Sequence, residues 1–143
     1  MYHSLDLRGI RVFENDDDIT KEEYTTDTLI EVIEESQTAI VFFSKHYATS
    51  SFCLRELVHI QKCIRGHNRA IWVVFYDVDS SDVRHQKNSY ETAFQRYHND
   101  EIKYDEKEVS EWRKALSKAA DVCGWHWEPR YIITFVSISL VIY

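Results

Sequence analysis

Two almost continuous apolar runs, separated by a stretch of helical period, most constrain what this chain can fold into. The runs are Thr38–Phe43 and Ala70–Tyr76. Strands read in this way when helices cover both faces of their sheet. Between them, apolar residues recur at the spacing of one helix face: Cys53, Leu57, Ile60 and Ile64, with Leu54 beside them. This strand–helix–strand order predicts a parallel sheet wrapped by helices.

Weaker patterns extend this unit in both directions. Ile10–Phe13 alternates as a short strand, and Thr25–Glu35 predicts a helix that buries Leu29, Ile30, Val32 and Ile33. Ser89–Tyr97 and Glu108–Val122 predict two further helices, and Trp125–Trp127 a short strand after Gly124. The buried faces of these helices are expected at Tyr90, Ala93, Phe94 and Tyr97, and at Val109, Trp112, Leu116, Ala119 and Ala120. A chain of 143 residues suits a single domain.

The helical stretch after the first apolar run holds the most informative side chains. Ser50 or Ser51 can cap its first turn, and we expect the helix to last to about Arg65. Ligands of open α/β sheets bind beyond strand ends of this kind. At about 100° per residue, Phe52, Glu56 and Cys63 share one flank of the apolar stripe. Glu56 is therefore expected at the edge of the core, neither deeply buried nor fully exposed.

Acidic segments follow two of the predicted strands. Glu14–Asp18 lacks the alternate oxygens and the glycine turn of a calcium loop, so we interpret it as a solvated loop. Asp77 and Asp79 follow the second apolar run and are expected at the ligand edge. They would suit a phosphoryl-accepting receiver domain, but the lysine that such domains carry near a later strand end has no counterpart.

Charge and cysteine usage restrict the partners. A net charge of −7 argues against a nucleic-acid surface, because phosphate binding needs excess Lys and Arg. The three cysteines form no CxxC pair, and no secretory signal follows Met1, so a reducing setting in the cytoplasm, with the nucleus as a second location, is expected. His59, Cys63 and His67 recur at every fourth residue, but Gly66 is expected to end the helix before His67. We therefore predict a helix flank with a half-buried thiol and no metal site.

The C-terminal segment differs in character from the rest. Residues 128–143 include a β-branched, uncharged apolar run that is too short to span a membrane. Its composition is typical of an edge strand or an aggregation-prone segment. Membrane association is a minor alternative.

Several motifs together resemble one family, the plant TIR (Toll/interleukin-1 receptor) domain. The resemblance covers roughly Met1–Trp127, in the order and spacing of the family. It is carried by Arg8–Phe13 (RGIRVF) with Asp16–Asp18, Ile33–Ser36 (IEES), Ala39–Ala48 (AIVFFSKHYA), Ser50–Leu57 (SSFCLREL), Val74–Asp79 (VFYDVD), Trp112–Leu116 (WRKAL) and Gly124–Trp125. The chain thus resembles part of a nucleotide-binding, leucine-rich-repeat immune receptor, or a short relative with a TIR domain alone.

The resemblance implies a fold and a division of the chain. The fold is a flavodoxin-like parallel sheet wrapped by helices, with residues 1–127 as a partial TIR domain and residues 128–143 as an atypical apolar tail. The first strand of the family, and the nucleotide-holding loop after it, have no counterpart here. That strand lies between the segments that correspond to Ile10–Phe13 and Thr38–Phe43. Its absence would leave backbone groups unpaired on both neighbours, and the tail is a segment that can fill the gap.

The resemblance also implies an activity and partners. Many plant members cleave NAD+ or NADP+ as substrate, without a further cofactor, and release nicotinamide. The catalytic carboxylate of the family corresponds to Glu56, and the nucleotide-binding positions beside it are Phe52 and Cys53. Leaving of nicotinamide produces an oxocarbenium-like ribose that a carboxylate can stabilise, and Phe52 can stack on a ring. Other TIR domains are the implied protein partners.

Two alternatives to catalysis remain open from the sequence. A non-catalytic adaptor or decoy would bind other TIR domains through the surfaces that the chain retains. A non-functional gene-model fragment would fail to form a stable sheet. Considered without the resemblance, Glu56 is a carboxylate near a helix N-terminus, where the helix dipole favours negative charge.

Overall fold

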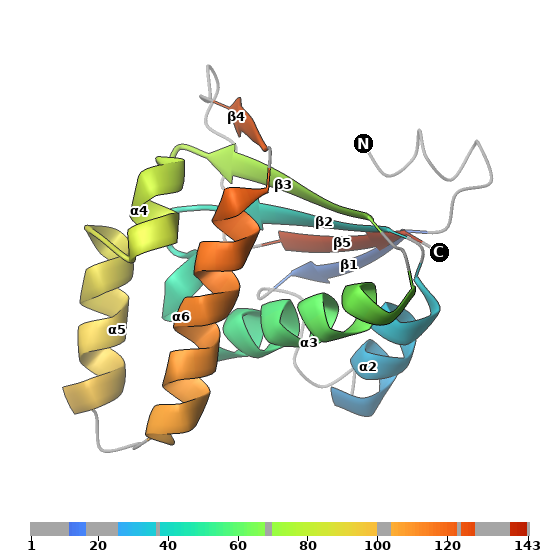
Figure 1. The fold of residues 1–143 in the computed structure, drawn as a ribbon, viewed down its shortest axis with the longest axis horizontal. Helices are drawn as coiled ribbons and strands as arrows, with labels where there is room; N and C mark the ends of the chain where they lie inside the picture. Colours follow the sequence, from blue (N-terminus) through green and yellow to red (C-terminus); the bar gives the residue numbers. More distant parts are fainter. Residues whose placement is uncertain are drawn as a thin grey trace.

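The computed structural model describes seven stretches of the chain, residues 12–16, 26–36, 38–67, 70–99, 104–122, 124–127 and 138–142. The residues before Val12, including the start of the strand expected at Ile10, lie outside them. In chain order the elements are β1 (Val12–Asp16), α2 (Thr26–Glu35), β2 (Thr38–Phe43), the short 3₁₀ helix η1 (Tyr47–Thr49), α3 (Ser51–His67), β3 (Ala70–Tyr76), α4 (Ser80–His85), α5 (Ser89–Asn99), α6 (Glu106–Asp121), β4 (Trp125–Trp127) and β5 (Ile138–Ile142). Figure 1 shows their arrangement.

The strands form one sheet in the order β1-β5-β2-β3-β4. β2 and β3 pair in parallel, from Thr38 opposite Ala70 to Phe43 opposite Phe75. β4 continues the parallel part, with Val74 opposite Trp125. The two apolar runs thus lie side by side with the boundaries that the sequence predicts, and the strand–helix–strand order is confirmed.

β5 lies inside the sheet, between β1 and β2, and runs antiparallel to both of them. Ser139 lies opposite Asn15 of β1 and opposite Val41 of β2. The expectation of an edge strand for this segment is therefore wrong, and the alternative in which the tail fills the gap is the arrangement found. The physical reason is that β1 and β2 both present unpaired N–H and C=O groups toward the gap, and an apolar strand between them satisfies both ladders.

Pairing with β5 also changes the interpretation of the acidic segment near the N-terminus. β1 includes Glu14, Asn15 and Asp16, opposite Leu140, Ser139 and Ile138. The solvated loop expected to begin at Glu14 is wrong for these residues. A polar sequence of low strand propensity is drawn into the sheet because β5 supplies its ladder.

The helices agree with the sequence in type, with differences at their ends. α3 continues through Gly66 to His67, so the expected stop near Arg65 is wrong by about one half-turn. A single glycine weakens a helix without ending it. α4 was not predicted: its N-cap Asp79 accepts a hydrogen bond from Ser81 N at 2.7 Å, which begins a short helix in the segment assigned to a loop. None of the helices that the structure describes has the length and apolar composition needed to cross a bilayer.

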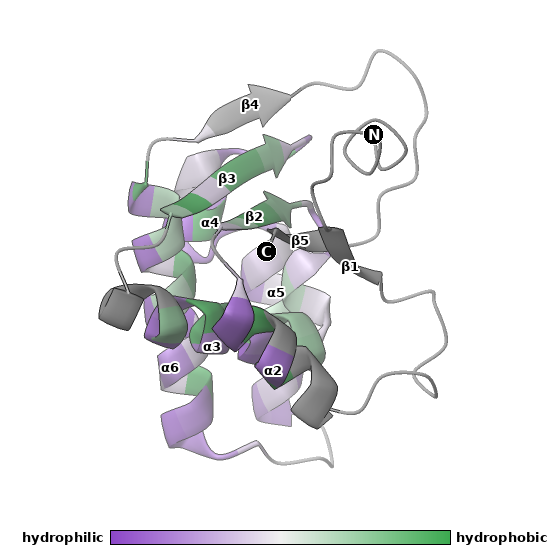
Figure 2. Cartoon of the chain, turned by 90° about the vertical axis from the view of Figure 1, so that its right-hand side faces the viewer, coloured by the Kyte–Doolittle hydropathy of each residue, from purple (hydrophilic) through white to green (hydrophobic). Residues whose placement is uncertain are grey.

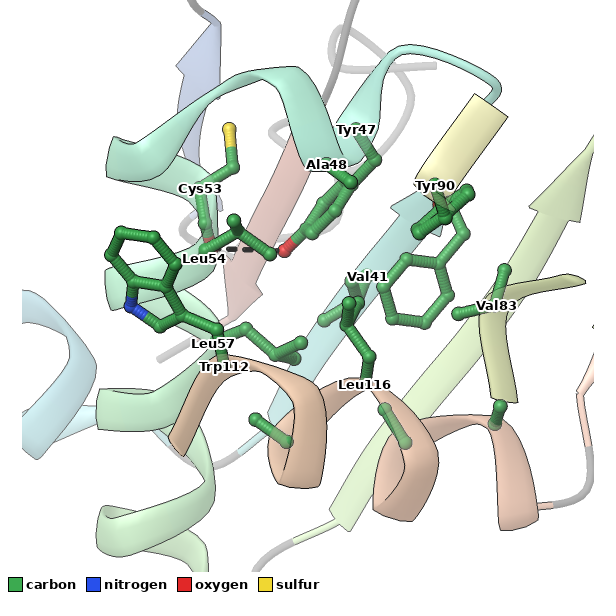
Figure 3. Packing of buried hydrophobic residues seen from close by; sticks show 14 of the residues in the cluster. Val41, Tyr47, Ala48, Cys53, Leu54, Leu57, Val83, Tyr90, Trp112 and Leu116 are labelled. Atoms are coloured by element: carbon green, nitrogen blue, oxygen red, sulfur yellow. Dashed lines mark hydrogen bonds between the residues drawn. The ribbon is translucent and has the colours of Figure 1, made fainter. Parts of the chain in front are cut away.

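The hydrophobic core lies between one face of the sheet and the helices. Along β3, Val73 and Phe75 are buried in this core, whereas Trp72 on the opposite face is 43% exposed. Figure 2 shows the apolar colouring of β2 and β3, with α2 and α3 lying along the sheet. Figure 3 shows the centre of the cluster, where side chains from β2, α3 and α6 meet: Val41, Leu54, Leu57, Trp112 and Leu116. The core stripe predicted for α3 is confirmed at Cys53, Leu54, Leu57 and Ile60.

Candidate functional site

The candidate site is built on the connection from β2 into α3. β2 ends at Phe43, the chain turns at Lys45 and His46, and η1 leads to Ser50. Ser50 has an extended backbone, and its hydroxyl accepts a hydrogen bond from Cys53 N at 3.3 Å. This is the geometry of an N-cap, as the sequence predicts for this position. The cap sets where α3 begins and therefore which way Glu56 faces.

Tyrosine hydroxyls hold this connection in place from several directions. Tyr90 Oη donates to Ser44 O at 2.9 Å, and Tyr97 Oη donates to Ala48 O at 2.8 Å. Tyr47 Oη donates to Cys53 O at 3.2 Å, the bond drawn in Figure 3. Each phenol donates to a backbone carbonyl, and Ser44 O accepts from Tyr47 N as well, so these bonds give the connection a fixed geometry without regular secondary structure.

Tyr90 is the most deeply placed of these anchors. Its side chain is fully buried beneath the loop, on the first turn of α5. Burial raises the pKa of the Tyr90 phenol well above its ordinary value, because the phenolate would lose its hydration. The neighbouring Cys53 and Asp82 add to this rise. Tyr90 therefore stays a hydrogen-bond donor to Ser44 across the physiological pH range.

Glu56 lies on the second turn of α3, and the structure buries it more completely than the sequence suggests. Its side chain is 3% exposed. Among the residues whose side chains are described, it is the one charged residue that is buried. The expectation of a half-exposed edge position is therefore wrong. Helical spacing places Glu56 beside the apolar stripe, but the elements packed around α3 decide how much water reaches it.

The two residues expected to contact a nucleotide occupy different environments. Phe52 is partly buried and packs against the core from the first turn of α3. Cys53 is 3% exposed and lies within the core itself, beside Tyr47 and Leu54 in Figure 3. Phe52 thus shares the flank of Glu56, whereas the Cys53 side chain serves packing. Their roles toward a ligand stay predictions.

α6 packs against α3, and side chains of α3 contact it directly. Arg55 Nε donates to Glu108 Oε1 at 2.6 Å, and the guanidinium lies 5.6 Å from the ring centre of Tyr104 and 5.9 Å from that of Trp112. The hydrogen bond to Glu108 raises the pKa of Arg55, against the opposing effect of partial burial. Gln61 Nε2 donates to Ala115 O at 2.7 Å one turn and a half further along. These contacts fix the rotation of α3 about its axis.

The carboxylates that follow β3 are engaged in structural contacts. Asp77 accepts from Lys45 Nζ at 2.7 Å, and Asp79 caps α4. Asp77 has a φ of 50°, a left-handed backbone that turns the chain sharply after the strand. Both side chains therefore hold the loop geometry at this edge of the sheet. The receiver-domain alternative gains no support from their placement.

A separate group of polar side chains meets where α2 packs on α3. Glu34, His59 and Cys63 bring ligand-type atoms within 4.8 Å of one another. Sequence spacing indicated His59 and Cys63 but missed Glu34, which is distant in the chain and gives no local signal. Cys63 is the half-buried thiol predicted for this flank.

Comparisons with known proteins place most of the chain in one family. The family model described as TIR domain matches residues 1–131. The chain is 40% identical to the disease resistance protein RPV1 of Vitis rotundifolia over 126 residues, which cover 88% of this chain and 9% of that protein. It is 41% identical to the TMV resistance protein N of Nicotiana glutinosa over 124 residues, covering 87% of this chain and 11% of that protein. The chain thus spans about a tenth of the length of these curated relatives.

A solved structure agrees with these matches. The TIR domains in the structure of the activated Roq1 resistosome, which directly recognises the pathogen effector XopQ, superpose with a TM-score of 0.75 and 35% identity. The match covers 87% of this chain and 75% of that one. Sequence motifs, the overall fold and similarity to plant resistance proteins agree, and the chain belongs to the TIR domain family of plant disease resistance proteins.

Proposed function

We propose that this TIR domain cleaves the bond between nicotinamide and ribose in NAD+ or NADP+, with Glu56 as the catalytic carboxylate. The observation that carries the proposal is the burial of Glu56, which is 3% exposed on the helix that follows β2. Buried carboxylates are rare, because a charge taken out of water loses its hydration. A carboxylate that stays buried at the flank of a helix often has a functional role that depends on its charge.

The chemistry suits a carboxylate in this position. Departure of nicotinamide leaves positive charge on C1 of the ribose and its ring oxygen, and a nearby carboxylate stabilises that charge as it develops. The interaction is stronger at a buried site than in water, because the effective dielectric constant is lower. Phe52, one turn earlier on the same flank, offers an aromatic face for stacking. Ser50, Tyr47 and Tyr97 hold the helix and loop that position both side chains.

Nicotinamide release by the purified chain tests this proposal. NAD+ and NADP+ are supplied separately, and nicotinamide and ADP-ribose products are separated by chromatography. Glu56→Gln preserves the size of the buried side chain and removes its charge, and circular dichroism shows whether the variant is folded. The matched control is Glu91→Gln, at an exposed glutamate on α5. We expect release by wild type and Glu91→Gln, and a loss of about a hundredfold or more in Glu56→Gln.

Two results would overturn the catalytic proposal. One is equal nicotinamide release by wild type and Glu56→Gln, which would show that the charge on Glu56 takes no part. The other is the absence of release above a no-protein blank from folded wild-type chain with either dinucleotide.

A second function, association with other TIR domains, is favoured by a different observation. The chain resembles TIR domains that were solved within an activated resistosome. In this chain β5 lies between β1 and β2, the place that the resemblance gives to the first strand of the family. Association through the surfaces of the fold does not depend on the sequence of the strand in that place.

Co-purification with a full-length TIR partner distinguishes binding from catalysis. The adaptor function predicts a complex that survives gel filtration and is unaffected by Glu56→Gln. Failure of the folded chain to associate with any full-length plant TIR protein tested would reject it. Nicotinamide release in the same samples shows whether both functions coexist.

A further inference from the structure

We propose that Glu34, His59 and Cys63 form a zinc-binding site that joins α2 to α3. The site lies further along α3 than the proposed catalytic carboxylate: His59 is about one helical turn beyond Glu56, and Cys63 is two turns, about 10 Å, beyond it. Nothing in the proposed nucleotide chemistry requires it. Its role follows from its position: a metal ion here would fasten one helix to the next.

The geometry supplies a compact set of donors from two elements. One atom from each side chain lies within 4.8 Å of the others: a carboxylate oxygen of Glu34, a ring nitrogen of His59 and the sulfur of Cys63. His59 and Cys63 are separated by one turn of α3, the spacing with which helices present paired metal ligands. Glu34 comes from the last turn of α2. Two helices therefore converge on one point with three different donor types.

The state of His59 points to a ligand. Its Nε2 atom is buried and has no hydrogen-bond partner among the described residues, although the side chain as a whole is 29% exposed. The Glu34 carboxylate oxygen lies 3.9 Å from Nε2, beyond hydrogen-bonding distance. A buried polar atom is normally satisfied, because leaving it without a partner costs about 1–3 kcal/mol. A metal ion between His59 and Glu34 would satisfy both atoms.

The donor set selects the class of metal. One thiolate, one imidazole and one carboxylate match the ligands of Zn²⁺, at bond lengths of about 2.0–2.3 Å. Tetrahedral geometry at these lengths places ligand atoms about 3.5 Å apart, so the three donors need to close by about 1 Å. Glu34 can make this movement, because its side chain is 59% exposed in the ion pair with His59. Water would complete the coordination, as in zinc sites with three protein ligands.

The competing explanation is a simple ion contact between Glu34 and a protonated His59, with the thiol uninvolved. The two explanations differ in the part played by Cys63. Zinc binding at this site needs the Cys63 thiolate, whereas the contact between Glu34 and His59 does not depend on it. Substitution of Cys63 therefore decides between them.

Zinc titration of the full chain tests the proposal. Chain freed of metal with a chelator is titrated with ZnCl₂ by calorimetry, and with CoCl₂ by absorption, where a thiolate ligand produces a charge-transfer band. Cys63→Ser, His59→Gln and Glu34→Gln remove the donors one at a time. The controls are Glu35→Gln, at the next residue of α2, and His98→Gln, at an exposed histidine of α5. Circular dichroism confirms that each variant is folded.

We expect wild type and both controls to bind one Zn²⁺ per chain and to gain thermal stability from it. Cys63→Ser should lose the Co²⁺ charge-transfer band, which excludes Cys53 and Cys123 as the source. Each donor variant should bind Zn²⁺ more than about tenfold more weakly, since even loss of a residue behind a metal ligand has effects of that size. Absence of binding by folded wild type, or an affinity unchanged by Cys63→Ser, overturns the proposal.

Discussion

Tyr90 and Ser44 are joined across 46 positions of sequence by a 2.9 Å hydrogen bond from the phenol to the backbone carbonyl. The bond connects the start of α5 to the residue that follows β2, and both partners are buried. It holds the loop that leads to α3. The position of Glu56 thus depends on a residue from a separate helix.

Removing this phenol should destabilise the fold. Tyr90→Phe keeps the ring and leaves the buried Ser44 carbonyl without this donor, so we expect the free energy of unfolding to fall by about 1–2 kcal/mol. Urea unfolding monitored by fluorescence measures this fall in the free energy of unfolding. Tyr97→Phe is the matched comparison and should cost less, because its bond to Ala48 O is only partly buried. A larger loss in Tyr97→Phe would contradict the importance assigned to burial.

Alkaline pH should weaken the fold through the same phenol. The pKa of Tyr90 is raised by burial above the value of about 10 that it has in the unfolded chain. Its contribution to stability is therefore complete below pH 10 and is lost as pH rises from there toward the folded-state pKa. In that window the slope from this group approaches about 1.4 kcal/mol per pH unit. Subtracting the pH profile of unfolding free energy of Tyr90→Phe from that of wild type isolates the contribution of Tyr90. Parallel profiles for the two proteins would show that Tyr90 does not cause the alkaline loss of stability.

The interior position of β5 in the sheet predicts a strong effect of proline at Ser139, the second residue of this strand. Ser139 pairs with both Asn15 and Val41, so Ser139→Pro removes a backbone donor from the interior of the sheet. Ser139→Thr keeps the backbone donor and the hydroxyl and adds only a methyl group, and it serves as the control. Hydrogen exchange at Thr38–Phe43 should accelerate in the proline variant and remain slow in the threonine variant. Equal protection in both would place the tail outside the sheet.

Gly124 should tolerate no side chain. A Cβ atom there would lie 2.8 Å from Val73 O and 2.8 Å from Phe75 Cε2. We expect Gly124→Ala to cost about 1–3 kcal/mol, because the backbone of β3 cannot yield as a flexible side chain can. Thermal unfolding gives the loss. In a Phe75→Leu background the added cost should be smaller but still present, since the contact with Val73 O remains. Neutral behaviour of Gly124→Ala would show that β3 shifts freely.

Local periodicity explains why much of the fold could be predicted. The bounds of β2 and β3 follow from two apolar runs, and the buried faces of α5 and α6 from the spacing of residues such as Phe94 and Trp112. A serine cap for α3 follows from residue type, which left Ser50 and Ser51 open, and the structure selects Ser50. These features depend on interactions within one or two turns, which a sequence displays directly. The family motifs add Glu56 as the residue of interest.

Features set by partners distant in the chain could not be obtained in this way. The Glu14–Asp16 segment is a strand only because β5 pairs with it. β5 is an interior strand only because its two neighbours leave backbone N–H and C=O groups to pair with it. Glu34 meets His59 through the packing of α2 on α3. Glu56 lies beside the apolar stripe by its own helical period, but its burial depends on everything packed around α3. Residue type and spacing thus determine which side chains share a face, whereas long-range backbone pairing and packing determine what that face contacts.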